Sequence, residues 1–262
     1  IKLDVSNFFP SLNHKELSSR LSKRIVDKNI LQLIESAIST PTVSKSRASD
    51  QLETIGIPQG LAISNILAAI YMINIDRYFN KQNSTSYYRY VDDVLIFCNS
   101  IDLNSIAKNI VRRFKKIGLE VHDPIVAPEK SSSGTVDEHV DYLVDKFKSG
   151  LVSVRNGSVE KLKESLVGIF TTHKHAKNPS EAFLIWRLNL RITGCVYEGK
   201  SKGWLFFFSE INDESLLHIM DHYLKNIINR FDVNISIKKF VRAFKEITLN
   251  KYQTNYIPNF DE

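Results

Sequence analysis

Several residue types are scarce in this sequence, and each scarcity argues against a class of protein. Only two cysteines, Cys98 and Cys195, occur among 262 residues, and neither belongs to a C-x-x-C pair. This argues against a disulfide-stapled scaffold and against a cysteine-rich zinc site, and it favours a reducing compartment. Apolar runs are also short: none approaches the roughly 18 residues that a membrane-spanning helix needs.

The residues that are abundant are typical of a globular protein. Hydrophobic residues make up 43% of the chain, which is enough for one large domain or two smaller ones with cores of their own. The formal net charge of +6 suits a polyanionic partner, although proteins with other functions carry as much. Because the sequence begins with Ile1 in a strand-like segment and not with Met, we expect an internal fragment or the ordered part of a longer chain.

Hydrophobic periodicity divides the chain into a mixed first part and a mostly helical second part, with a change of composition near residues 146–157. The first part is expected to contain a strand over residues 1–9 and a hairpin over 87–97. Its helices are expected over residues 14–25, 29–39, 65–79 and 104–117. The second part is expected to contain helices over residues 159–172, 180–197, 213–231 and 236–249. The aromatic run 204–208 is interpreted as a core strand, with a self-association surface as the alternative.

The first segment that points to chemistry is LDVSNFF, residues 3–9, in which Asp4 lies within a predicted strand. An aspartate in the strand of a buried sheet costs several kcal/mol unless its charge is compensated, and a metal ion is one such compensation. The alternative is an aspartate at a strand end that caps the following turn.

The second segment is GIPQGLAIS, residues 56–64, which leads into the predicted helix 65–79. Gly60 would allow a backbone to approach a ligand closely, and the Gln59 amide can donate or accept a hydrogen bond. Ser64 is expected to cap the helix. The alternative is a plain Pro-Gly turn before a core helix.

The third segment is YVDD, residues 90–93, flanked by apolar strand residues. Two adjacent carboxylates in such surroundings repel each other and resist burial, and divalent cations relieve both problems. Oxygen ligands with an incomplete shell suit Mg²⁺, which keeps water and substrate phosphates as further ligands. The alternative is an ordinary polar hairpin turn that happens to contain two aspartates.

Taken in order, an aspartate in a strand, a P-Q-G turn and Y-x-D-D in a hairpin resemble the reverse transcriptase family from Lys2 to about Phe147. The resemblance implies an α+β fold, the palm of a right-hand polymerase with an antiparallel sheet and packed helices, followed by a mostly helical thumb. The implied domains are a palm with residual fingers elements over residues 1–148 and a thumb or C-terminal region over 149–262. It also implies a fingers subdomain before Asp4, which this sequence does not contain.

The resemblance assigns roles to the residues of these segments. Asp4, Asp92 and Asp93 become the catalytic acids and the ligands of two Mg²⁺ ions, for which Mn²⁺ is a substitute. Gln59 and Gly60 become part of the nucleotide-binding site.

Further positions are assigned by the same resemblance. Val5 joins the nucleotide-binding residues, and Phe9 lies where the family places a bulky gate against the ribose 2′-hydroxyl. Lys130 resembles a lysine that meets the triphosphate, with a solvated loop lysine as its alternative. The primer grip is assigned to Tyr142, Leu143 and Val144, where Val144 replaces the usual glycine.

The resemblance predicts an RNA-directed DNA polymerase that uses dNTPs, an RNA template and a primer to make DNA, with no membrane partner. A dedicated non-coding RNA is one option for the template, and a homo-oligomer is one option for the assembly. Residues 187–195 and 203–209 look similar to bacterial anti-phage defence enzymes, so we expect a bacterial cytoplasmic protein. The alternatives are a group II intron maturase type, a retron enzyme, an RNA-synthesising polymerase, or an RNA-binding scaffold with an inactive palm.

Overall fold

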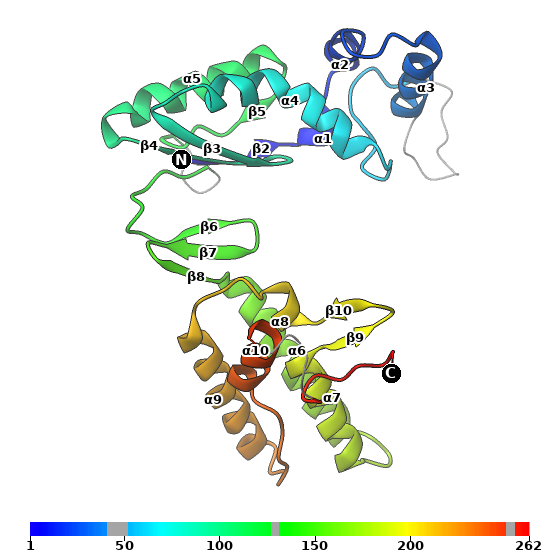
Figure 1. The fold of residues 1–262 in the computed structure, drawn as a ribbon, viewed down its shortest axis with the longest axis vertical. Coiled ribbons are helices and arrows are strands. Elements are labelled where there is room, and N and C mark those ends of the chain that lie inside the picture. Colours follow the sequence, from blue (N-terminus) through cyan, green and yellow to red (C-terminus); the bar gives the residue numbers. More distant parts are fainter. Residues whose placement is uncertain (41–51, 127–130, 250–254, 262) are drawn as a thin grey trace. The chain divides into compact units, whose positions relative to one another are not determined.

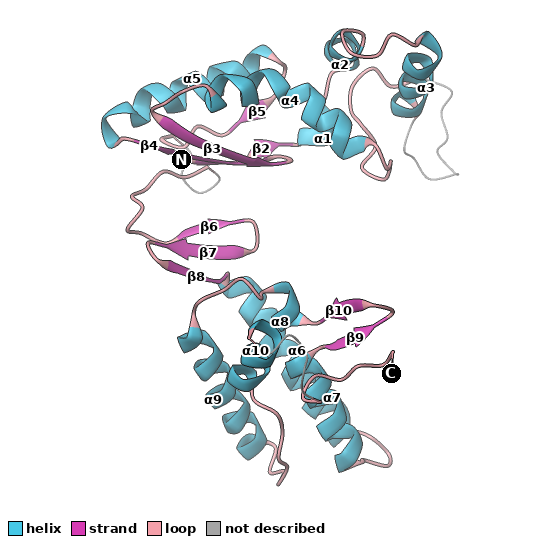
Figure 2. Cartoon of the chain, viewed as in Figure 1, coloured by secondary structure: helices cyan, strands magenta, loops and turns pink. Residues whose placement is uncertain are grey.

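The computed structural model describes residues 1–40, 52–126, 131–249 and 255–261. The chain forms two compact units, Ile1–Thr135 and Val136–Glu262, and each is described by itself. The expected combination of an antiparallel sheet with packed helices, followed by a mostly helical region, is confirmed (Figure 1, Figure 2). None of the described helices is long and apolar enough to cross a membrane.

The first unit is built around a three-stranded antiparallel sheet in the order β1-β4-β3. Its strands are β1 (Lys2–Leu3), β3 (Thr85–Tyr90) and β4 (Asp93–Cys98), and a second, two-stranded sheet pairs β2 (Val5–Ser6) with β5 (Glu120–Val121). The hairpin predicted over residues 87–97 is confirmed as β3 and β4. In β4, Val94 and Ile96 are fully buried, so one face of the sheet packs on the core of this unit.

The continuous strand predicted over residues 1–9 is wrong in its second half. The extended chain ends at Ser6, because Asn7 adopts a left-handed conformation with φ of 46° and a short helix, α1 (Phe8–Ser11), follows. Asparagine tolerates this conformation better than most residues, and the fixed φ of Pro10 suits the first turn of a helix. The turn buries Phe8 and leaves Phe9 half-buried.

The described part of the first unit also contains four longer helices: α2 (His14–Leu21), α3 (Lys28–Ser39), α4 (Ser64–Asn80) and α5 (Leu103–Lys116). All four were predicted, although α2 ends four residues earlier than expected. Asn13 caps α2 by accepting a hydrogen bond from the amide of Glu16 at 3.2 Å. The prediction that Ser64 caps α4 is wrong: Ser64 is the first helical residue, and its hydroxyl donates to the carbonyl of Pro58 at 2.5 Å.

In its described residues, the second unit combines two small sheets with five helices. Its strands are β6 (Val140–Tyr142), β7 (Asp145–Lys148) and β8 (Leu151–Val154) in one antiparallel sheet, and β9 (Cys195–Tyr197) with β10 (Lys200–Lys202) in a hairpin. Its helices are α6 (Asn156–Lys174), α7 (Glu181–Thr193), α8 (Trp204–Phe207), α9 (Glu214–Arg230) and α10 (Phe240–Thr248). The domain boundary was expected at residue 148, whereas the two units divide after Thr135. The strands β6 and β7 therefore belong to the second unit, where they form a sheet with β8.

The aromatic run 204–208 is not the core strand that its composition suggested. It forms the single helical turn α8, which buries Trp204 and Leu205 and leaves Phe207 66% exposed. The chain enters this turn through Gly203, whose φ of 148° lies outside the range of other residues. The aromatic composition of residues 204–208 therefore favoured a strand, but the segment after Gly203 is a helical turn.

Candidate active site

The register of the central sheet brings the first and third sequence segments together. Leu3 of β1 lies opposite Val94 of β4, and Lys2 lies opposite Leu95. The next position of this antiparallel register places Asp4 across from Asp93. Two aspartates that are almost 90 residues apart in the sequence therefore occupy neighbouring backbone positions at one end of the sheet.

Asp4 and Asp93 lie on the face of the sheet opposite the one that carries Leu3 and Val94. Side chains alternate between the two faces of a strand, and the neighbours of the acids, Leu3 and Val94, are fully buried on the core side. Asp4 is accordingly exposed, and Asp93 is half-buried. The expected cost of burying Asp4 therefore does not arise, and the informative feature is the adjacency of the backbone positions of the acids.

The third acid, Asp92, lies in the two-residue turn that joins β3 to β4. Tyr90 pairs with Asp93, so Val91 and Asp92 are the two central residues of the turn. Val91 has a φ of 55°, a conformation that a β-branched residue adopts only at a cost of about 1 to 3 kcal/mol. The strained residue of the turn therefore directly precedes Asp92 and Asp93 in the chain.

The three aspartates offer the right kind of ligand for Mg²⁺, because carboxylate oxygens are hard donors. Their backbone positions are adjacent, as the register and the turn show. Among the residues that the structure describes, however, no three acidic, imidazole or thiol side chains are grouped closely enough to hold a metal ion. The aspartates thus have the ligand chemistry and the backbone positions that Mg²⁺ requires. Their side chains do not form a closed ligand set in this structure.

The second sequence segment contacts the first through the backbone. The amide of Ile57 donates to the carbonyl of Phe9 at 2.9 Å, which ties the turn 56–60 to α1. Gln59 and Gly60 are exposed. A methyl group added at Gly60 would meet no atom within 4 Å, so the packing of the described chain does not itself require a glycine there.

The remaining positions predicted for nucleotide binding differ in their surroundings. Val5 is 4% exposed and pairs with Val121 of β5, so it belongs to the core of the first unit. Phe9 is half-buried and contacts Phe8 edge to face, with ring centres 5.3 Å apart. Lys130 lies outside the described residues.

Three polar residues near the acids were missed by the sequence analysis. The hydroxyl of Ser131 accepts a hydrogen bond from the amide of Asp4 at 3.0 Å, and nothing in the local sequence indicated this contact. Asp76 and Arg89 form an ion pair at 2.6 Å, and Arg89 also donates a hydrogen bond to the carbonyl of Val91 in the turn. The alternation of β3 offered a signal here, because Arg89 shares the less exposed positions of that strand with Tyr87.

The predicted primer-grip residues form a hairpin turn in the second unit. Tyr142 ends β6 and pairs with Asp145, so Leu143 and Val144 are the central residues of the turn. Leu143 has a φ of 56°, and its carbonyl accepts a hydrogen bond from Arg155 Nη1 at 2.8 Å. The turn therefore exists without the glycine that the family commonly places at Val144.

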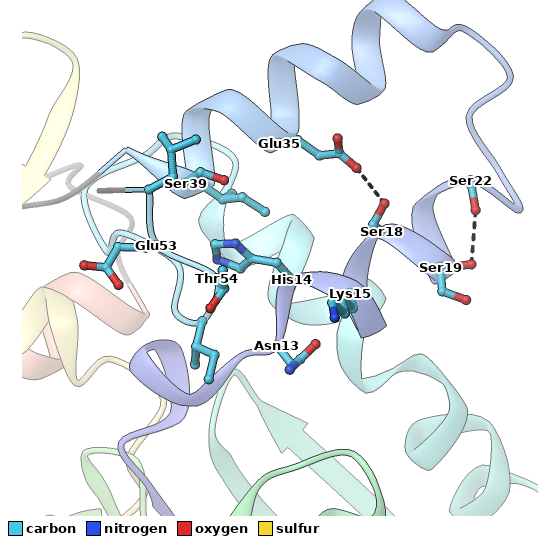
Figure 3. A pocket seen from close by; sticks show the side chains of 13 residues that line it. Asn13, His14, Lys15, Ser18, Ser19, Ser22, Glu35, Ser39, Glu53 and Thr54 are labelled. Carbon is cyan, nitrogen blue, oxygen red and sulfur yellow. Dashed lines mark hydrogen bonds between the residues drawn. The ribbon is translucent and has the colours of Figure 1, made fainter. Parts of the chain in front are cut away.

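A pocket in the first unit lies between α2, α3 and residues 52–55 (Figure 3). Ser18 on α2 donates to Glu35 on α3 at 2.6 Å across it. His14 contacts the carbonyl of Gly56 at 2.5 Å. None of the predicted site residues belongs to its described lining, so this pocket is separate from the acids.

Comparisons with known proteins agree with the order of the segments. The model of the family described as "Reverse transcriptase (RNA-dependent DNA polymerase)" matches residues 1–144. A 91 kDa protein in the cob intron of Schizosaccharomyces pombe is 32% identical over 89 residues, and the COX1/OXI3 intron 2 protein of Saccharomyces cerevisiae is 32% identical over 82 residues. These alignments cover 34% and 31% of this chain, and 11% and 10% of the relatives. The chain thus spans about a tenth of the length of the curated relatives it matches.

Solved structures with similarity to the chain include two polymerases bound to nucleic acid. Telomerase from Candida tropicalis in complex with a fragment of telomeric RNA is 15% identical, with a TM-score of 0.48, and the alignment covers 97% of this chain and 46% of that one. The foamy viral protease-reverse transcriptase in complex with an RNA/DNA hybrid is 17% identical, with a TM-score of 0.43, and the alignment covers 90% and 28% of the two chains.

Proposed function

Because this chain belongs to the reverse transcriptase (RNA-dependent DNA polymerase) family, we propose that it carries the catalytic unit of an RNA-directed DNA polymerase. The reaction is nucleotidyl transfer, in which a deoxynucleotide is added to a primer opposite an RNA template. The observation that carries the proposal is the register of β1 and β4, which places Asp4 across from Asp93 within the family match. The partners are an RNA template, a primer with its DNA product, and dNTPs.

In this proposal Asp4, Asp92 and Asp93 hold two Mg²⁺ ions. Bound there, the ions supply Lewis acidity to the primer hydroxyl and neutralise charge on the triphosphate. The contribution of the chain is position: the register of β1 against β4 brings the backbones of Asp4 and Asp93 together, and the turn between β3 and β4 carries Asp92. Gln59 and Gly60 offer an amide and an uncrowded backbone to the nucleotide.

Primer extension by the full-length protein tests this function. An RNA template with an annealed DNA primer, dNTPs and Mg²⁺ is expected to give DNA product, and EDTA is expected to stop the reaction. A protein that binds the same template tightly but extends no primer with either Mg²⁺ or Mn²⁺ would instead support an RNA-binding scaffold.

Substitution of Phe9 tests the proposed sugar gate. Phe9→Val removes a half-buried ring and is expected to raise the relative kcat/KM for ribonucleotides over deoxynucleotides by about 10- to 100-fold, since a steric gate of this size is worth a few kcal/mol. Single-nucleotide incorporation with matched rNTP and dNTP measures the ratio. Phe8→Val is the matched control: Phe8 is 3% exposed, so its loss should lower stability and leave sugar selectivity unchanged. Equal selectivity in Phe9→Val and the parent protein would remove the gate assignment.

Within this activity, we propose an intron-encoded type of reverse transcriptase. The support is that both curated relatives described above are proteins of introns. An anti-phage defence enzyme is the second candidate, and its support is the resemblance of residues 187–195 and 203–209. Sequencing the nucleic acid that copurifies with the full-length protein separates them, because intron RNA favours the first and a dedicated non-coding RNA the second.

A further inference from the structure

We propose that Arg89, itself anchored by Asp76, is a positioning residue that fixes the turn carrying Asp92 and thereby sets the geometry of the acid cluster. This inference rests on the proposed function for its consequence in catalysis. Neither residue is a candidate metal ligand or nucleotide contact. Both lie in the first unit, Asp76 on α4 and Arg89 on β3, on the core side of the sheet below the turn.

The guanidinium of Arg89 links three elements by hydrogen bonds. Its Nε and Nη2 donate to the two carboxylate oxygens of Asp76 at 2.8 Å and 2.6 Å. Its remaining terminal nitrogen, Nη1, donates to the carbonyl oxygen of Val91 at 2.7 Å. The hydroxyl of Tyr87 donates to the same Asp76 carboxylate at 2.9 Å. One side chain thus connects α4 to the residue that immediately precedes Asp92.

The contact falls on the strained residue of the turn. A two-residue hairpin turn with positive φ at its first central position normally has glycine there, because glycine adopts that conformation without strain. This chain has Val91 at that position, with a φ of 55°. A β-branched residue disfavours the conformation, so something outside the turn must hold it. The hydrogen bond from Arg89 to the Val91 carbonyl is such a contact.

The charges involved are largely shielded from water. The side chain of Arg89 is 10% exposed and that of Asp76 is 22% exposed. Burial by itself acts to lower the pKa of Arg89, but the hydrogen bonds and charge of Asp76 outweigh it, so the pKa is raised. Burial, followed by the charge of Asp76, likewise raises the pKa of Tyr87. The guanidinium therefore stays charged, and its three directed hydrogen bonds keep a fixed geometry.

The second unit repeats the arrangement at the turn 143–144. Leu143 has a φ of 56°, and Arg155 Nη1 donates to its carbonyl at 2.8 Å. That guanidinium is far more open, with its side chain 47% exposed and its distance to Asp141 at 3.5 Å. An arginine on the carbonyl of a strained turn residue is thus a recurrent device in this chain. Near the acids, Arg89 is held more firmly, because two hydrogen bonds of 2.8 Å and 2.6 Å join it to the carboxylate of Asp76.

Arg89→Lys is the discriminating variant. Lysine keeps the positive charge but cannot reproduce a two-pronged bond to Asp76 together with a third bond to the Val91 carbonyl. We expect kcat for primer extension and affinity for Mn²⁺, used as a paramagnetic probe, to fall by about 10- to 100-fold each, as is typical when a supporting contact of a metal site is lost. The KM for the primer–template is expected to stay unchanged. Arg112→Lys, at an exposed arginine of α5, is the matched control and should change none of these values.

The second variant is a rescue. Val91→Gly removes the strain of the turn, so adding it to Arg89→Lys should restore at least half of the lost Mn²⁺ affinity and kcat. Amide hydrogen exchange over residues 85–98 should accelerate in Arg89→Lys and recover in the double variant. A loss that Val91→Gly does not recover would assign Arg89 to general stability and overturn the proposal, as would unchanged exchange and Mn²⁺ affinity in Arg89→Lys. A parent protein that extends no primer would remove the proposed function, while hydrogen exchange would still decide whether Arg89 holds the turn.

Discussion

The double substitution Asp92→Asn/Asp93→Asn is expected to reduce primer extension by at least about 1,000-fold, which is the largest effect that we predict for this chain. Asparagine keeps the size and shape of aspartate but removes both negative charges that would bind the divalent ions. The fold should survive, because neither acid is buried in the core. The rate of single-nucleotide incorporation, measured at saturating Mg²⁺, gives the size of the loss.

Two controls separate lost chemistry from lost structure. Asp102→Asn removes a carboxylate from the same unit, at the start of α5, where its side chain caps no amide. It should extend primers at the parent rate. Asp4→Asn should lose activity on its own, because the register of β1 and β4 places Asp4 across from Asp93. Full activity in both Asp4→Asn and the double variant would end the case for an acid cluster in this sheet.

The elements that the sequence predicted well are those whose pattern depends on local spacing. The apolar segment 65–79 indicated a helix and forms α4, although Ile66 is 62% exposed and the helix is buried on one face only. The segment 87–97, rich in Tyr, Val and Ile, forms the hairpin of β3 and β4. The order of the three segments also indicated which acids belong together. The register of β1 against β4 agrees, since buried Leu3 and Val94 both have an aspartate as a neighbour.

The features that the sequence did not predict depend on contacts between distant residues. Nothing near Arg89 shows that Asp76 lies beneath it, because the pairing arises only when α4 packs on the sheet. The aromatic run 204–208 was misread for the same reason: strand propensity is local, whereas the approach of Gly203 to Gly194 decides how the chain enters α8.

Gly194→Ala is expected to have the largest effect on stability, lowering the free energy of unfolding of the second unit by about 3 to 5 kcal/mol. Gly194 ends α7 with a φ of 68° and ψ of −163°, a combination that is essentially restricted to glycine. An added methyl group would lie 2.3 Å from the carbonyl oxygen of Lys202 and 3.1 Å from the Cα of Gly203. Both contacts are with backbone, which cannot move aside as a flexible side chain would.

Substitutions at two other glycines, Gly199 and Gly168, serve as controls for the stability change expected in Gly194→Ala. Gly199 has a φ of 65° but no neighbour within 4 Å of an added methyl group, so Gly199→Ala should cost only about 1 kcal/mol for its backbone conformation. Gly168 is exposed in the middle of α6 with open space around it, so Gly168→Ala should raise stability by about 1 kcal/mol. Both tryptophans, Trp186 and Trp204, belong to the second unit, so urea unfolding followed by tryptophan fluorescence reports on it directly. If Gly194→Ala unfolded at the same urea concentration as Gly199→Ala, the close backbone crossing of residues 194 and 203 would contribute nothing beyond its dihedral angle.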